Sequence, residues 1–123
     1  MCALVIDDSA TMRRILGRML SRMGFEVAEA GNGREGLERL RQSGPIDLVL
    51  VDWNMPEMDG LAFVRAVRAD PTYKSVRLMM VTTENDLSRV AIALEAGANE
   101  YVMKPFTEEV MREKLQLLEV IPG

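Results

Sequence analysis

The chain has 123 residues, of which 48% are hydrophobic and 28% are charged, and this is the composition of an ordinary globular protein. A chain of this length has room for one core that buries roughly two-thirds of the unfolded surface, so residues 1–123 are expected to form a single domain. The 19 Asp and Glu residues outnumber the 15 Lys and Arg residues, and no basic block is present, which argues against nucleic acid as the main ligand. No apolar run is long enough for a signal peptide or a membrane span, and Cys2 has no internal partner for a disulfide. These features favour a cytoplasmic protein that does not bind membranes.

Five short apolar runs are predicted to be strands. They cover residues 3–6, 25–30, 48–51, 78–81 and 101–103. The run at 48–51 has four consecutive apolar residues, which is typical of a strand buried on both faces. The run at 25–30 is interrupted by Glu26 and Glu29 and is therefore expected nearer to an edge of the sheet.

Apolar residues at helical spacing follow each predicted strand. The predicted inner faces are Met12, Ile15, Leu16, Met19, Leu20 and Met23 in the first helix, Leu37 and Leu40 in the second, Leu61, Val64 and Val67 in the third, Leu87, Val90, Ala91 and Leu94 in the fourth, and Val110, Met111, Leu115 and Leu118 in the last. Gly24 is expected to end the first helix, and Thr107 is expected to begin the last. Strands that alternate with helices imply parallel crossovers. The predicted fold class is α/β, a doubly wound five-stranded parallel sheet of the flavodoxin-like kind with strand order 2-1-3-4-5.

Polar residues stand directly after four of the predicted strands. They are Asp7, Asp8, Asp52, Thr82 and Lys104. A single Asp after a strand is most often a turn former or a helix cap. In a parallel sheet, however, the carboxyl ends of the strands share one edge, where ligands bind, so these five residues are expected to form one site.

The residue types at this edge indicate phosphoryl chemistry. Two carboxylates about 4 Å apart repel each other by roughly 4 kcal/mol at an effective dielectric constant of 20, so the three acids need a cation or a proton. Because the chain has no histidine, oxygen atoms must hold any metal, and Mg²⁺ prefers oxygen. Lys104 would supply a charge and Thr82 a hydroxyl donor to a phosphoryl oxygen. With no Cys or His nearby, the nucleophile is expected to be a carboxylate that forms an aspartyl-phosphate.

The chain resembles the receiver domains of two-component response regulators, and within them the single-domain chemotaxis regulators. The motifs that carry the resemblance are Asp7-Asp8-Ser9, Asp52-Trp53-Asn54-Met55-Pro56 with Asp59-Gly60, Val81-Thr82, Gly97-Ala98, and Tyr101 with Lys104-Pro105-Phe106. The resemblance covers the whole chain. It implies that Asp52 is the phosphoacceptor for a phosphohistidine on a histidine kinase or a histidine phosphotransferase.

The same resemblance implies the roles of the surrounding residues. Asp8, Asp52 and the backbone carbonyl of Asn54 would bind Mg²⁺ directly, and Asp7 would act mainly through a bound water. Lys104 would pair with Asp52 at rest, and the Lys104–Pro105 peptide bond would be cis.

The resemblance also implies a switch. Thr82 would move toward the phosphoryl group and Tyr101 would turn inward, although Tyr101 also fits a static edge aromatic. The output surface would be the fourth helix, the fifth strand and the fifth helix of a monomer. Asn54 and Glu84 would influence hydrolysis of the aspartyl-phosphate, and Trp53 should report on the site by fluorescence.

The chemotaxis interpretation predicts a downstream protein target at the flagellar motor switch. The start of the fourth helix, residues 84–89, lacks the paired lysines of the best-known chemotaxis regulator. A regulator outside motility, or a phosphate shuttle or sink in a phosphorelay, is therefore an alternative. Thr83 is bulkier than the alanine common at its position and should slow access to the phosphoryl group.

Two further alternatives differ in class. A phosphatase of the haloacid-dehalogenase type also uses an aspartyl nucleophile with Mg²⁺, but it needs Asp-x-Asp where this chain has the adjacent acids Asp7 and Asp8. A receiver-like domain that only binds partners would not need the complete set of acids, hydroxyl and lysine. We therefore expect a signalling protein that catalyses only its own phosphotransfer and dephosphorylation.

Overall fold

The computed structural model describes residues 1–83 and 87–122. Its strands are β1 (Cys2–Ile6), β2 (Glu26–Ala30), β3 (Leu48–Asp52), β4 (Arg77–Thr82) and β5 (Glu100–Met103). Its helices are α1 (Ala10–Arg22), α2 (Gly33–Gln42), α3 (Gly60–Ala69), the 3₁₀ helix η1 (Pro71–Tyr73), α4 (Leu87–Ala96) and α5 (Glu108–Leu117). The strands form one parallel sheet in the order β2-β1-β3-β4-β5, which confirms the predicted order.

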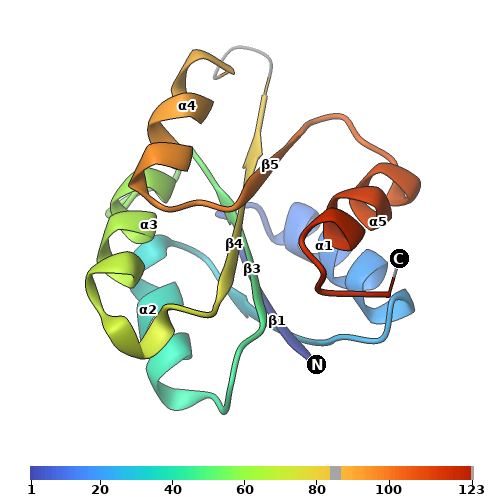
Figure 1. Ribbon diagram of the computed structural model, residues 1–123, viewed down its shortest axis with the longest axis horizontal. Coiled ribbons are helices and arrows are strands. Elements are labelled where there is room, and N and C mark those ends of the chain that lie inside the picture. The colour runs from blue at the N-terminus through green and yellow to red at the C-terminus, as the bar shows by residue number, and fades with distance from the viewer. Residues whose placement is uncertain (84–86, 123) are drawn as a thin grey trace.

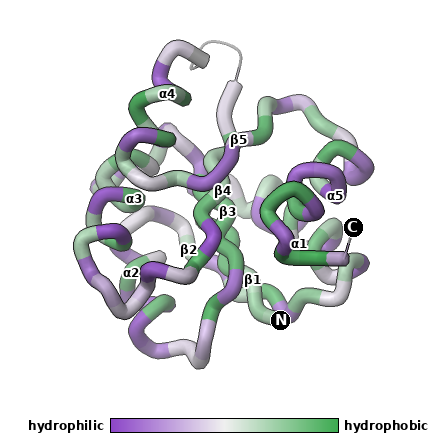
Figure 2. Tube along the Cα trace, in the orientation of Figure 1, coloured by the Kyte–Doolittle hydropathy of each residue, from purple (hydrophilic) through white to green (hydrophobic). Residues whose placement is uncertain are grey.

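The helices cover both faces of the sheet. α2, α3 and α4 lie on one side, and α1 and α5 lie on the other (Figure 1). Alternate residues of each central strand therefore enter different cores: Leu4 and Ile6 of β1 pack on the α2–α4 side, and Ala3 and Val5 pack on the α1–α5 side. The central strands are hydrophobic over most of their length, while hydrophilic segments lie mainly on the outer helices (Figure 2).

The ends of α1 and α5 follow from local sequence. The Ser9 side chain accepts a hydrogen bond from the backbone of Met12 at the start of α1, and Thr107 does the same for Val110 at the start of α5. After α1 the chain turns at Gly24, whose φ of 96° lies in the left-handed region that favours glycine. The predicted end of the first helix and the predicted start of the last are confirmed.

Within the described ranges, no helix is long and apolar enough to cross a membrane.

The predicted inner face of α4 is wrong in part. Val90 and Ala93 are buried, but Ala91 is exposed and the Leu94 side chain is 40% exposed. The Leu87 side chain lies outside the described part of the structure. Most positions of α4 are apolar, so the sequence pattern does not define a single face. The tertiary packing of α4 therefore selects the face that carries Val90 and Ala93.

Two other residues predicted to face inward lie at the margins of their apolar stripes. Ile15 of α1 is 43% exposed, and Val110 of α5 is 37% exposed. Their neighbours Leu16 and Met111 are almost completely buried. The buried stripes of α1 and α5 are therefore narrower than the sequence pattern indicated.

Arg68 connects α3 to three other segments at the edge of the sheet opposite the carboxyl ends of the strands. Its Nε donates to the carbonyl of Gly97 at 2.9 Å, and its Nη1 donates to that of Tyr73 at 3.0 Å. Its Nη2 donates to the carbonyl of Val76 at 2.7 Å and to Oδ1 of Asn99 at 2.8 Å. One guanidinium thus satisfies acceptors from η1, the approach to β4 and the α4–β5 connection.

We expect Arg68→Ala to lower the free energy of unfolding by about 2 kcal/mol, because several half-buried acceptors lose a charged donor. Arg65→Ala is the matched control, since Arg65 is an exposed arginine on the same helix. Its effect should stay within about 0.5 kcal/mol. Urea denaturation of both variants measures the difference, and equal losses would contradict the structural role of Arg68.

Candidate functional site

The register of the sheet brings the predicted site residues to one edge. Ile6 of β1 lies opposite Val51 of β3, so Asp7 and Asp52 come one residue later on neighbouring strands. In β4, Thr82 is the last residue and lies opposite Met103, the last residue of β5. Lys104 follows at once, and its backbone N–H donates to the carbonyl of Thr82 at 2.7 Å.

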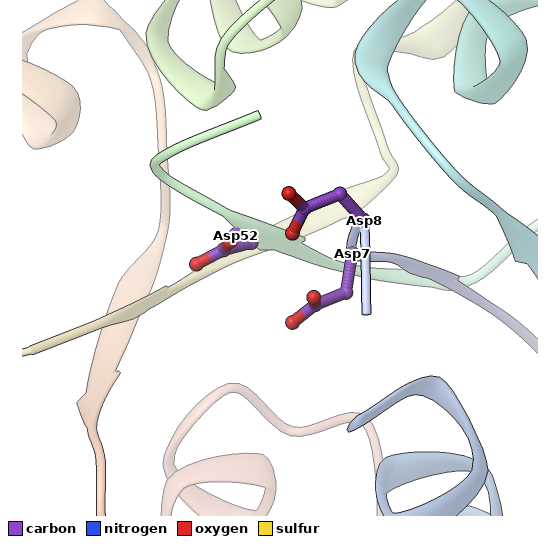
Figure 3. Close-up of side chains that lie close together, drawn as sticks. All are labelled: Asp7, Asp8 and Asp52. Carbon is purple, nitrogen blue, oxygen red and sulfur yellow. The ribbon is translucent and has the colours of Figure 1, made fainter. Parts of the chain in front are cut away.

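Asp7, Asp8 and Asp52 form a compact acidic cluster. One carboxylate oxygen from each lies within 4.8 Å of the others. Asp8 and Asp7 follow β1 and Asp52 ends β3, so the three side chains come from two adjacent strands (Figure 3). Asp7 is only 2% exposed, Asp52 is 14% exposed at its side chain, and Asp8 is exposed. An all-oxygen donor set with an excess of negative charge suits a hard cation such as Mg²⁺.

Lys104 lies between the two less exposed acids. Its Nζ is 3.4 Å from Oδ2 of Asp7 and 3.7 Å from Oδ1 of Asp52. The expected contact with Asp52 is present, but the contact with Asp7 is the shorter one. The lysine therefore neutralises part of the charge of the whole cluster rather than that of Asp52 alone.

The environment raises the pKa of Asp52 from 3.8 to about 6. Burial is the main cause, because it disfavours the charged carboxylate. Asp7 and Asp8 raise the pKa further by like-charge repulsion, whereas the Lys104 charge lowers it. Since burial and the neighbouring acids disfavour the charged form of Asp52, a cation that neutralised those neighbours would stabilise the carboxylate.

The loop after Asp52 folds back tightly on the strand end. The backbone N–H of Gly60 donates to the carbonyl of Trp53 at 3.0 Å. A Cβ at position 60 would lie 2.5 Å from the backbone oxygen of Asp52, so this close approach requires glycine. Glu57 in the same loop has a φ of 65°, in the left-handed region. This local geometry keeps the end of β3 at the carboxyl edge of the sheet.

Thr82 and Tyr101 have partners other than the acidic cluster. The buried Thr82 hydroxyl donates to the carbonyl of Thr83 at 3.3 Å. The half-buried Tyr101 ring lies beneath the Lys114 ammonium, 4.6 Å from Nζ to the ring centroid. The same ammonium is 3.3 Å from Oε1 of Glu100. Tyr101, on β5, is thus contacted at its ring by a side chain from α5, while it also packs against the core on the α2–α4 side.

Other predicted residues are placed as follows. Asn54 is exposed in the loop after Asp52, and Trp53 is buried beneath the Arg89 guanidinium, 5.6 Å from Cζ to the ring centroid. The Lys104–Pro105 peptide bond is cis. Glu84 lies outside the described residues.

Two contacts of Asp7 were not predicted from the sequence. The backbone N–H of Ser9 donates to Oδ1 of Asp7 at 2.8 Å, and Nη1 of Arg13 donates to the backbone carbonyl of Asp7 at 2.6 Å. Ser9 enters the prediction only as part of the motif Asp7-Asp8-Ser9; a serine before a helical pattern signals a helix cap, but not this backbone contact. Arg13 lies off the face that Arg14, Arg18 and Arg22 share at a spacing of four residues, but nothing in the sequence indicates which group it contacts.

Comparison with known proteins agrees with this geometry. The family model described as response regulator receiver domain matches residues 3–116. The chain therefore belongs to the response regulator receiver domain family. Members of this family are signalling regulators rather than classical enzymes.

Several relatives are chemotaxis proteins. The chain is 48% identical over 116 residues to the chemotaxis protein CheY1 of Helicobacter pylori, and the match covers 94% of each chain. It is 45% identical to the chemotaxis protein CheY of Pseudomonas aeruginosa, covering 92% of this chain and 91% of that one. Among solved structures, the chemotaxis protein CheY4 of Vibrio cholerae superposes with a TM-score of 0.86 at 34% identity, covering 94% of this chain and 96% of that one.

Proposed function

We propose that the chain is a stand-alone response regulator that accepts a phosphoryl group on Asp52 and then changes its protein contacts. The observation that carries the proposal is the meeting of three carboxylates and Lys104 at the carboxyl edge of the sheet. The donor would be the phosphohistidine of a histidine kinase or a histidine phosphotransferase. In the transfer, a carboxylate oxygen of Asp52 attacks phosphorus as the bond from phosphorus to the donor imidazole breaks.

Asp8, Asp52 and the backbone carbonyl of Asn54 would hold Mg²⁺, while Asp7 would act through a bound water. A bound Mg²⁺ would offset the negative charge of the phosphoryl oxygens. Lys104 is close enough to Asp52 to contact a phosphoryl group attached there. The Thr82 hydroxyl would exchange its weak contact with the Thr83 carbonyl for a phosphoryl oxygen.

The response would be read on α4, β5 and α5. When Thr82 moves, Tyr101 would leave its place beneath Lys114 and turn inward, so the two packings would exchange as a population shift. Exposed apolar side chains on these elements, Ile92, Leu94 and Val110, suit a protein partner. Asn54 and Glu84 would tune hydrolysis of the aspartyl-phosphate.

The relatives suggest where such a module acts. Proteins 45–48% identical to this chain bear the name of chemotaxis proteins. We therefore place the chain in cytoplasmic chemotaxis signalling, as a monomer whose downstream target is the flagellar motor switch. A role as phosphate shuttle or sink would leave the chemistry at Asp52 unchanged.

Phosphorylation by acetyl phosphate tests the proposal. Incubation with Mg²⁺ should add one phosphoryl group to the native chain, detected by intact-mass spectrometry, and Asp52→Asn should abolish the addition. Glu57→Gln is the control, because Glu57 is an exposed acid in the same loop. Its labelling should match that of the native chain. Equal labelling of Asp52→Asn and the native chain would refute the assignment of the acceptor.

A further inference from the structure

Every backbone and side-chain polar group of Asp7 makes a hydrogen bond. Its backbone N–H donates to the carbonyl of Ala30 at 3.1 Å, and its carboxylate accepts from the backbone of Ser9 and from Lys104. Its own carbonyl accepts from Nη1 of Arg13 at 2.6 Å, the shortest of these bonds. Asp7 is therefore fixed in position before any ligand binds.

Arg13 is itself anchored to the neighbouring strand. Its Nε donates to Oε1 of Glu29 at 3.0 Å, so one guanidinium joins α1 to the end of β1 and to β2. The Arg13 side chain is only 21% exposed. Arg14 and Arg18, on the same helix, are exposed.

The Asp7 carbonyl belongs to the same planar peptide unit as the backbone nitrogen of Asp8. Holding that carbonyl therefore fixes the direction in which the chain enters Asp8. The Asp8 side chain is exposed, so the position of its carboxylate depends mainly on the backbone that carries it. A fixed backbone at Asp8 therefore constrains where this carboxylate lies. Groups that orient a metal ligand through a hydrogen bond commonly contribute tenfold or more to metal affinity.

We propose that Arg13 is a positioning residue for divalent-cation binding at the acidic cluster. Its bond to the Asp7 carbonyl holds the Asp7–Asp8 peptide so that the Asp8 carboxylate faces Asp52. This inference rests on the proposed function, because it concerns the Mg²⁺ that the three acids would hold.

The sign of the effect separates positioning from simple electrostatics. A positive charge near the site repels a cation, so removal of Arg13 would strengthen Mg²⁺ binding if only its charge mattered. Loss of positioning instead weakens binding. The two explanations predict changes in opposite directions.

The test is a Mg²⁺ titration of the purified chain, followed by Trp53 fluorescence and by calorimetry. Arg13→Ala should weaken Mg²⁺ binding about tenfold. Arg13→Lys keeps the charge but loses the planar fork, and its binding should also weaken. Arg14→Ala is the matched control, and because its charge is exposed and screened, its affinity should stay within about twofold of native.

Thermal unfolding without Mg²⁺ shows whether each variant is folded, and Arg13→Lys decides if Arg13→Ala does not fold. Unchanged or tighter Mg²⁺ binding in a folded Arg13 variant would overturn the inference alone. A native chain that shows no Mg²⁺ binding by either measurement would contradict the proposed function and the inference together.

Discussion

Replacement of Asp52 by asparagine should make the native state more stable at pH 7. Asp52 has its pKa raised to about 6, mainly by burial, so at neutral pH the folded protein holds a carboxylate in unfavourable surroundings. A pKa shift of this size corresponds to roughly 3 kcal/mol of folding free energy. Solvent screening at the partly exposed edge of the sheet reduces this to about 2 kcal/mol. Asparagine has a similar shape without the charge, so Asp52→Asn should raise the free energy of unfolding by about 2 kcal/mol.

The gain should depend on pH in a defined direction. Between about pH 4 and pH 6 the native state holds the Asp52 proton more tightly than the unfolded state, whose pKa is close to 3.8. The contribution of Asp52 to stability therefore falls as the pH rises through this window and is lowest above pH 6. Below pH 4 both states are protonated, and the advantage of asparagine should vanish.

Urea denaturation at several pH values between 4 and 7.5, without Mg²⁺, measures this dependence. Glu38→Gln is the control, because Glu38 is an exposed acid on α2 that does not belong to the cluster, and its effect should be small at every pH. A gain for Asp52→Asn that is the same at pH 4 and pH 7 would exclude the carboxylate charge as its source.

The edge at which the site forms could be predicted because it depends on features written locally in the sequence. Apolar runs such as residues 48–51 indicate buried strands, and helices between them require parallel connections. Once the strands are parallel, residues that follow them must share an edge. The closeness of Asp7, Asp52 and Lys104 follows from this rule, although they are far apart in the chain.

The inner face of α4 could not be predicted, because most positions of that helix are apolar. Val90 and Ala93 are buried, whereas Leu94 is 40% exposed, so the face that packs on the core is one of several apolar faces that the sequence offers. The choice of face is set by the packing of all the layers together. No local pattern of residues records it.

The details of the site also depend on tertiary geometry. Lys104 lies nearer to Asp7 than to Asp52, although β3, which carries Asp52, is closer to β5 in the strand order than β1 is. The contact of Arg13 with the Asp7 carbonyl depends on how α1 packs against β2. The sequence predicts which residue types lie at the carboxyl edge of the sheet, whereas the three-dimensional packing decides which atoms are in contact.

Removal of the Lys104 charge should have the opposite effect to Asp52→Asn. Lys104 is the cation within salt-bridge distance of both Asp7 and Asp52 in the described part of the chain. Lys104→Met would leave two buried or half-buried carboxylates without it, and breaking such a pair by removing one partner costs about 3 kcal/mol. The free energy of unfolding at pH 7 should fall by about that amount.

The loss should be smaller at pH 5, because the Lys104 charge lowers the pKa of Asp52 and its removal lets Asp52 take up a proton at higher pH. It should also be smaller when Asp52→Asn is present, since one of the two unpaired charges is then gone. Lys74→Met, at an exposed lysine, controls for the general loss of a positive charge. If Lys104→Met costs the same at both pH values and in both backgrounds, the lysine acts through packing of its side chain, and the coupled charges at this edge do not govern the stability of the protein.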